Sequence, residues 1–342
     1  MRVGVNPEKE NNTIKFDIYH RIIIPVYIPN FEGYFKDGLE IFKLCIQSLL
    51  MTVHEKTRIT IYNNASHIVV ENYINELYKK EELIDQVFHS KINVGKINAI
   101  LAASKGCLEP LITVSDADVF FKNNWQSSVE KIFMNFREAG MVSPVPSSKA
   151  FKNFVDANWY NGFFKGKIRF ENVRDKEGLI KFDESLGNSK PLYSPIHLKK
   201  YLVLTNKKEK AVMGCGHFVA TLRREVFDKG SNSPAFNKIV GGVENRFIDQ
   251  PNQDLGFLRL ATLANYAYHL GNTIDEWMFD EFKKITNNKE QPLDVEKLLT
   301  YTKYNFMQLK IGDLLKKILL SSVFKSWYFK KIGLRSDKPL DY

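Results

Sequence analysis

Two carboxylates stand two positions apart at the end of a short apolar run. Residues 111–114 read Leu-Ile-Thr-Val, and Asp116 and Asp118 follow before a second apolar run at residues 119–121. An apolar, β-branched run of this length predicts a buried strand, and acids beside a buried strand need a positive partner. A divalent cation that also binds phosphate would supply it, because Mg²⁺ prefers one or two carboxylates plus substrate oxygens. A surface turn with aspartates is the alternative.

Strand and helix signals alternate around this pair. Apolar runs at residues 21–27 and 57–62 predict two further strands, and helical periodicity follows each. This alternation predicts an α/β fold with a mostly parallel, doubly wound sheet, whose ligands bind at the carboxyl ends of the strands. Three such ends carry Pro25, Val26 and Tyr27; Asn63 and Asn64; and Ser115, Asp116, Ala117 and Asp118. We expect them to line one crevice.

The two common phosphate-binding motifs are missing from the sequence. Gly95 and Lys96 lack the earlier glycine and the following Ser or Thr of a P-loop, and no G-x-G-x-x-G follows the first predicted strand. The sequence therefore disfavours the usual ATPase and dinucleotide-binding folds. A nucleotide would have to be held by the crevice and a metal ion.

Four segments, taken in order, resemble a known family. Residues 22–27, 61–66, 93–99 and 115–118 are similar to the GT-A nucleotide-sugar glycosyltransferases, most closely family 2. The resemblance implies a Rossmann-like, mostly parallel sheet with flanking helices, a cation (Mn²⁺ or Mg²⁺) on the D-x-D pair, and inverting hexosyl or hexosaminyl transfer from a nucleoside diphosphate. The implied nucleotide-sugar-binding residues are Pro25, Val26, Tyr27, Asn63, Asn64, Asn93, Lys96, Asn98, Ser115, Asp116, Ala117, Gly214 and His217.

The chain departs from this family at the end of the second predicted strand. Family members usually place an aspartate there for the base or ribose, whereas this chain has Asn63 and Asn64. An amide can still hydrogen-bond a uracil edge, so UDP is the expected carrier, although the departure leaves the base open.

The resemblance also implies a carboxylate that acts as general base. Asp254 matches best, because residues 254–260 resemble the family's helix start, Asp249 is second and Glu244 third. Gln253 replaces the glutamate that usually precedes this aspartate. Pro251 suits a first helical position, and the periodicity of residues 255–263 predicts a helix. Acids placed there only for the helix dipole are the alternative.

His269 lies within an alternating run, residues 266–270, that predicts an edge strand. Several GT-A enzymes use a histidine here as a third metal ligand, and imidazole suits Mn²⁺ better than Mg²⁺. A core or surface histidine is the equal alternative. Cys215, in a glycine-flanked turn, is interpreted as a small buried thiol and not as a nucleophile.

Composition and charge narrow the class of protein. The chain has 342 residues, 44% of them hydrophobic, a net charge of +10 and three widely spaced cysteines. Neither a disulfide framework nor a zinc spacing is apparent, and we expect a cytoplasmic protein without a secretory signal. The interpreted divisions are an N-terminal extension (1–19), a nucleotide-sugar half (20–140), an acceptor and catalytic half (141–290) and a helical, basic tail (291–342).

The segment from Met141 to Lys200 has weak periodicity and predicts a long irregular excursion. Its aromatic side chains favour packing under loops over stacking on a sugar ring. They are Trp159, Tyr160, Phe163, Phe164 and Phe170.

The tail combines basic, apolar and aromatic residues. Residues 310–342 contain eight Lys or Arg and three Asp, a net of +5, which is half of the total charge. This composition predicts peripheral contact with an anionic membrane surface, on the inner face of the cell membrane. Packing of residues 311–319 on the catalytic domain is the alternative for the first half, so we assign the contact to residues 323–331. The expected apolar face holds Ile311, Leu314, Leu315, Ile318 and Leu319, opposite Lys310, Lys316 and Lys317.

Two function classes follow. The first is a metal-dependent glycosyltransferase in polysaccharide assembly, with a glycan or lipid-linked acceptor. The second is a non-catalytic nucleotide- or glycan-binding protein of the same fold, attached to the membrane surface. Nucleic acid is disfavoured as a partner, because the tail lysines are interleaved with a continuous apolar face.

Overall fold

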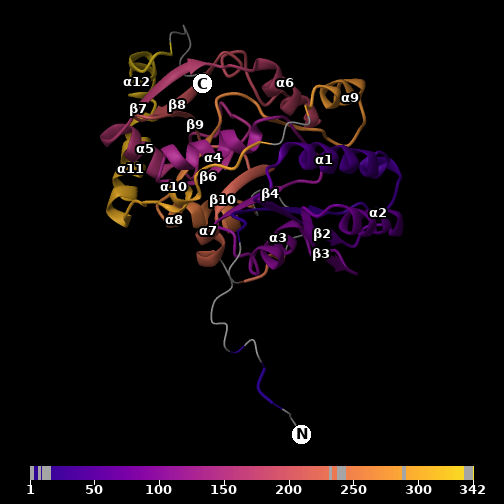
Figure 1. Ribbon diagram of the computed structural model, residues 1–342. Helices are drawn as coiled ribbons and strands as arrows, with labels where there is room; N and C mark the ends of the chain where they lie inside the picture. The colour runs from indigo at the N-terminus through magenta and orange to yellow at the C-terminus, as the bar shows by residue number, and fades with distance from the viewer. Residues whose placement is uncertain are drawn as a thin grey trace.

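A ten-stranded mixed sheet forms the centre of the molecule, in the order β3-β2-β1-β4-β10-β6-β11-β9-β8-β7. The computed structural model describes residues 4–6, 9, 17–230, 233–236, 244–286, 290–334 and 342. The pairings leave β10, β9 and β7 running against the other seven strands of this sheet. The predicted α/β architecture, with flanking helices and C-terminal helices, is confirmed (Figure 1).

The N-terminal half is a parallel, doubly wound sheet. Its strands are β1 (His20–Val26), β2 (Thr57–Asn64), β3 (Ile84–Ser90) and β4 (Leu111–Ser115), joined through η2 (Gly33–Phe35), α1 (Gly38–Thr52), α2 (Ile68–Lys80) and α3 (Lys96–Ser104). Helices α1 and α2 pack on one face of these strands and α3 packs on the other. The strands predicted at residues 21–27, 57–62 and 111–114 all lie here.

Pro25 lies within β1 and does not end it. It is paired with Tyr62 of β2, but the pairing of β1 with β4 stops at Ile23. Pro25 thus lies beyond the part of β1 that pairs with β4, so its missing N–H removes no hydrogen bond to that strand.

Residues 141–200 are more regular than predicted. After β4 come β5 (Val119–Phe121), α4 (Trp125–Asn135) and β6 (Ala139–Ser143), which ends just inside this segment. The segment itself holds α5 (Asp156–Phe164), β7 (Lys167–Asn172) and α6 (Lys176–Ser185). The prediction of a long irregular excursion was therefore wrong. The sequence did not reveal β7 because it is an edge strand in which only Ile168 and Phe170 are buried. Two inward residues give a weak periodic signal. Strands β8 (Lys200–Thr205), β9 (Lys210–Met213) and β10 (Val219–Arg223) and helix α7 (Arg224–Lys229) follow.

The predicted helix at residues 255–263 was also wrong. The described elements of this part are η3 (Asn245–Asp249), α8 (Gln250–Asp254), β11 (Leu258–Ala261), β12 (Ala267–His269), α9 (Glu276–Lys283), α10 (Val295–Leu299), α11 (Phe306–Leu319) and α12 (Lys325–Lys331). Gly256 stops α8 at φ +81°, where a Cβ would lie 1.9 Å from the carbonyl oxygen of Tyr304. β11 is buried on both faces, and such a short apolar run cannot be told from a helix by periodicity.

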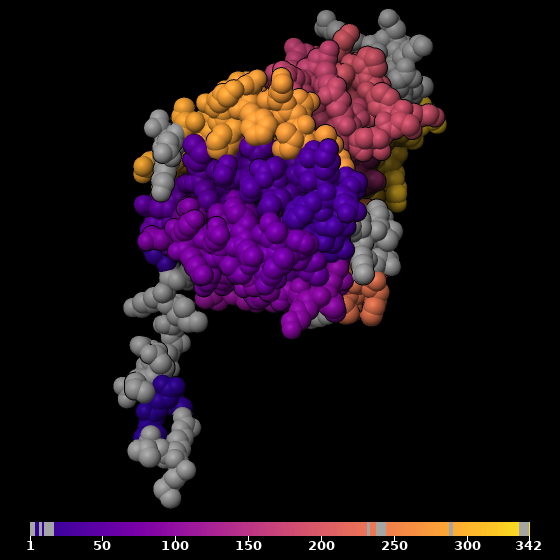
Figure 2. Space-filling view, turned by 90° about the vertical axis from the view of Figure 1, so that its right-hand side faces the viewer, coloured from indigo at the N-terminus to yellow at the C-terminus, as the bar shows by residue number. Residues whose placement is uncertain are grey.

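Helices lie on different sides of the molecule. Figure 1 shows α1, α2 and α9 on the side opposite to α5, α11 and α12. Figure 2 shows the α1–α2 side, where the N-terminal half in indigo and purple forms most of the surface and an orange segment runs along its upper edge.

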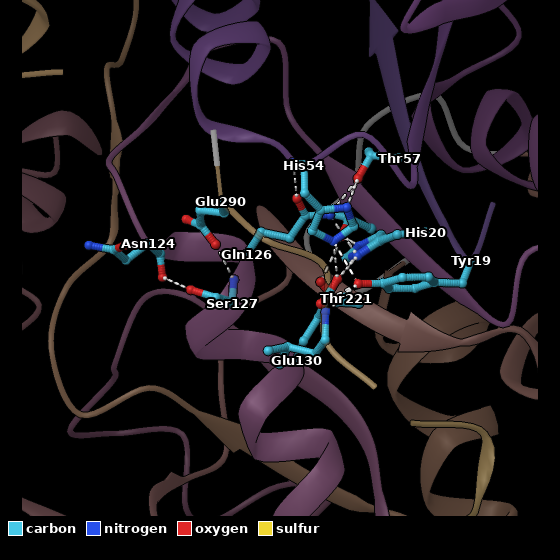
Figure 3. Close-up of polar contacts among 12 residues, drawn as sticks. Tyr19, His20, His54, Thr57, Asn124, Gln126, Ser127, Glu130, Thr221 and Glu290 are labelled. Carbon is cyan, nitrogen blue, oxygen red and sulfur yellow. Dashed lines mark hydrogen bonds and ion pairs between the residues drawn. The ribbon is translucent and has the colours of Figure 1, made fainter. Parts of the chain in front are cut away.

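A buried polar network ties β1 to α4 (Figure 3). Glu130 Oε1 lies 2.7 Å from His20 Nδ1 and 3.0 Å from His54 Nε2, and the Tyr19 hydroxyl donates to Glu130 Oε2 at 2.9 Å. Burial favours the neutral acid, but hydrogen bonds from both histidines outweigh it and hold the Glu130 pKa below its ordinary value. Because the atoms facing one another are already hydrogen-bonded, we interpret this cluster as structural and not as a metal site.

Candidate functional site

A cavity of about 440 Å³ opens at the carboxyl ends of β1, β2 and β4. This is the edge at which a parallel sheet binds its ligands. Its described lining consists of Pro25, Val26, Tyr27, Ile28, Tyr34, Phe35, Gly38, Ile41, Asn64, Asn93, Lys96, Asp116, Ala117, Asp118, Glu244, Gly271 and Asn272. Eight of the thirteen residues predicted to bind the nucleotide sugar are among them.

Three predicted metal ligands lie close together beside this cavity, which Asp116 and Asp118 line directly. Asp116, Asp118 and His269 each offer one ligand atom, and these atoms lie within 4.8 Å of one another. The short strands β5 and β12 bring them together, since His269 is paired with Val119 and the Leu270 N–H donates to the Asp118 carbonyl at 2.8 Å. The sheet thus joins residues that are about 150 positions apart in the chain.

The His269 ring is held by aromatic neighbours. Its ring centroid lies 5.3 Å from that of Phe218, at an interplanar angle of 82°, and 6.2 Å from that of Phe182. Such edge-on contacts fix a ring plane. The Nε2 atom lies 3.5 Å from Asp118 Oδ2, so the imidazole faces the carboxylate with a nitrogen that can bind a metal.

Asp118 carries a buried oxygen that suits a cation. Among the described residues, Asp118 Oδ1 has no hydrogen-bond partner, and a buried acceptor left unpaired is costly. Burial raises the Asp118 pKa, the Asp116 charge adds to that rise, and His269 and Lys96 oppose it. Two carboxylates and an imidazole are a donor set that Mn²⁺ accepts, so the residues fit the implied metal.

Lys96 connects two acids across the cavity. It is the first residue of α3, after Gly95 at φ +86°, and its ammonium forms an ion pair with Asp116 and lies 3.6 Å from Glu244 Oε1. Burial opposes its charge, but the carboxylates of Asp116, Glu244 and Asp118 outweigh burial and raise the Lys96 pKa. The site therefore holds a fixed positive charge beside the acid pair.

The remaining predicted binding residues lie outside the described lining. Asn63 donates toward His89 Nδ1 at 3.0 Å, and the Asn98 side chain exchanges two hydrogen bonds with the backbone of Ala235. Gly214 packs against Ala150, whose carbonyl oxygen would lie 2.0 Å from an added Cβ. Ser115 is buried. His217, the fifth of these residues, lies beside Asp249. The contacts of Asn63, Asn98 and Gly214 join loops and strands around the cavity.

The two favoured general bases also lie outside the described lining. Asp254 is the exposed last residue of α8, and its Oδ1 accepts a hydrogen bond from Gln250 at 2.6 Å. Asp249 is fully buried between His217 and Arg259, and His217 Nδ1 and Arg259 Nη2 each lie 3.3 Å from one of its carboxylate oxygens. Of the three candidate general bases, Glu244, the third choice from sequence, is the one in the described lining of the cavity.

Sequence reasoning missed one wall of the cavity. Tyr34, Phe35, Gly38 and Ile41 come from η2 and the start of α1, and the Asn272 side chain donates to the Tyr34 carbonyl at 3.2 Å. The sequence offered only one signal for this wall, which is position: residues 28–37 follow the first predicted strand and so leave the sheet at the same edge.

The chain was compared with known proteins. No protein-family model matches it, and no curated protein matches its sequence. GalNAc-T7, solved with UDP, GalNAc and Mn²⁺, matches with TM-score 0.47 and 15% identity over 74% of this chain and 44% of that one. This chain thus spans less than half of that structure. S. aureus TarS with UDP-GlcNAc gives TM-score 0.45 and 10% identity over 94% and 77%. The Pyrobaculum calidifontis mannosyltransferase PcManGT, with GDP-Man and Mn²⁺, gives 0.43 and 10% over 93% and 85%.

Proposed function

We propose that this protein is a metal-dependent glycosyltransferase that takes a sugar from a nucleoside diphosphate. The observation that carries the proposal is the close approach of Asp116, Asp118 and His269 to one another, beside a cavity that the two aspartates line together with Lys96 and Glu244. Departure of a diphosphate needs positive charge, which a bound metal ion and a lysine can supply. Activation of an acceptor hydroxyl needs a separate carboxylate that accepts its proton.

The donor would lie along the ends of β1, β2 and β4. Asp118 and His269 would hold a divalent cation, which supplies positive charge against the leaving diphosphate. Lys96 adds a second positive charge. Asp116 forms an ion pair with that lysine and would also bind the cation. Asn64 and Asn93 are hydrogen-bonded to each other at 3.0 Å and offer amide groups to the base or ribose. We expect uracil as the base.

We assign the role of general base to Glu244. Its carboxylate would accept the proton of an acceptor hydroxyl while that oxygen bonds to the anomeric carbon. The bond from that carbon to the diphosphate oxygen breaks in the same displacement, the electron pair leaves with the diphosphate, and the configuration inverts. Asp254 and Asp249 are the competing assignments, and mutation separates the three.

The acceptor would be a glycan or lipid-linked sugar that enters beside the donor. A second cavity of about 250 Å³ shares Gly271 and Asn272 with the first. Its wall carries Trp277, with Lys181 Nζ 4.0 Å from the ring centroid. An aromatic body and a cation suit a sugar with an acidic neighbour, so Trp277→Ala should raise the acceptor KM and leave the donor KM unchanged.

A thermal-shift screen of UDP- and GDP-sugars with and without Mn²⁺ tests the binding part of the proposal. A ligand that binds the folded state raises the melting temperature by mass action, and the donor should do so only when the metal is present. A non-catalytic binding protein of the same fold would give this shift without releasing nucleoside diphosphate. No metal-dependent shift with any donor would contradict both functions.

A further inference from the structure

Helix α11 turns an apolar stripe toward solvent. Met307, Ile311, Leu314 and Ile318 follow one another at spacings of four, three and four residues, which places them on one side of the helix. Met307 is 66% exposed and Leu314 is 57% exposed. Four large apolar side chains in a continuous exposed row are unusual on a monomeric surface.

The orientation of α11 is fixed by its other side. Gly312 lies against α5, where an added Cβ would be 2.0 Å from the Asp156 carbonyl oxygen, and Lys316 forms an ion pair with the Asp156 carboxylate. We predicted from the sequence that the apolar residues of this helix form one face, but in the structure they lie on two sides of the helix. Leu315 and Leu319 pack inward, so the stripe cannot rotate into the core without breaking the contacts with α5.

Helix α12 and the turn before it add exposed apolar residues. They also correct the prediction that residues 323–331, the aromatic second half of the tail, make the membrane contact. Phe329 is buried, 5.1 Å from Phe170 between ring centroids, and Tyr328 is buried with it. Val323 and Trp327 face solvent, at 77% and 56% exposure. The contact surface is therefore not the aromatic run alone but the outward residues of both helices.

Lysines accompany these residues. Residues 306–334 contain six lysines and one aspartate, a net of +5. We call the following set the basic–apolar face: Met307, Ile311, Leu314, Ile318, Val323 and Trp327, with the exposed Lys310, Lys317, Lys330 and Lys331. Figure 1 shows α11 and α12 at the same end of the molecule.

We propose that the basic–apolar face docks on an anionic lipid surface. Apolar side chains alone would suit any partner, but lysines beside them match the headgroups of acidic lipids and raise affinity at low salt. Lys331 Nζ lies 4.9 Å from the centroid of the Trp327 ring, a pairing that places an amphipathic ring and a cation at one depth. None of the helices described has the length and apolarity to span a bilayer, so the contact is interfacial.

Vesicle co-sedimentation of the full-length protein tests this proposal. The probes are vesicles of phosphatidylcholine alone and vesicles with one third phosphatidylglycerol, without donor or metal. We expect binding to the anionic vesicles that weakens with added salt. Leu314→Gln with Ile318→Gln should lower the partition coefficient roughly tenfold, and Lys317→Gln with Lys331→Gln should lower it on the order of tenfold on anionic vesicles only.

The matched control is Ile68→Gln with Val69→Gln, two exposed apolar residues of α2 at the other side of the molecule. This variant should bind like wild type. Equal binding of wild type to both vesicle types would overturn the proposal, as would a stripe variant that binds undiminished. The proposal would also be overturned if wild type bound no vesicles but formed a concentration-dependent dimer in light scattering, and if the Leu314→Gln, Ile318→Gln variant were monomeric. Because the assay contains no donor, its failure would leave the proposed enzymatic function untouched.

Discussion

At the scale of single residues, the proposed general base Glu244 allows the sharpest test of the proposed chemistry. It lines the cavity and lies 3.6 Å from Lys96 Nζ. Glu244→Gln keeps the shape and removes the base, so kcat should fall by about 10²–10⁴-fold with little change in donor affinity. Steady-state kinetics with a matched Asp254→Asn variant checks this. If Asp254→Asn loses the activity and Glu244→Gln keeps it, our assignment is wrong.

Lys96 should act on donor binding. It is the cation that the cavity holds beside Asp116, and its charge would face a diphosphate. Lys96→Met should raise the donor Kd about tenfold in titration calorimetry, since a charge-assisted contact is lost. Lys91→Met, at an exposed loop position, is the control and should change nothing. A Lys96→Met protein that binds donor like wild type would remove this residue from the site.

At the scale of elements, the turn at Gly256 separates α8 from β11. Gly256→Ala would place a Cβ at φ +81° and 1.9 Å from the Tyr304 carbonyl oxygen. We expect a loss of about 2 kcal/mol in the free energy of unfolding, measured by urea denaturation. Gly106→Ala meets no described atom within 4 Å and should be neutral. Equal stability of the two variants would contradict the steric argument.

The network under β1 predicts a pH dependence of stability. Burial lowers the His20 pKa from 6.5, although Glu130 opposes this. Below that value the unfolded chain binds a proton that the folded protein does not, so stability falls as the solution is acidified. The melting temperature should drop from about pH 7.5 to about pH 5.5, and His20→Gln should flatten that slope. An identical slope in both proteins would show that His20 does not carry the effect.

The same elements show what could be predicted from sequence and what could not. The cavity residues Val26, Asn64 and Asp116, at or just after the ends of β1, β2 and β4, were predictable, because a parallel sheet brings its carboxyl ends to one edge. His269 was placed by analogy, and its neighbour Asp118 is fixed by a β5–β12 pairing that no local pattern indicates. Glu244 ranked low, since nothing local reveals which of three acids reaches a cavity.

At the scale of the whole molecule, the cavity and the basic–apolar face are separate surfaces. Helices α1 and α9, near the cavity residues Ile41 and Asn272, lie across the molecule from α11 and α12 (Figure 1). Distant sites act additively. The Leu314→Gln, Ile318→Gln variant should therefore keep wild-type turnover of a soluble donor. A matched loss of turnover and vesicle binding would show that the two surfaces are coupled.

The most direct test of the central claim is metal-dependent release of nucleoside diphosphate. Metal-stripped protein would be given a panel of UDP- and GDP-sugars with an acceptor mixture, with and without Mn²⁺. We predict release with one donor class, dependent on Mn²⁺ and reduced at least about a hundredfold in Asp118→Asn and in His269→Gln. Undiminished release without metal, or in both variants, would contradict the assignment of this cavity as a metal–diphosphate site.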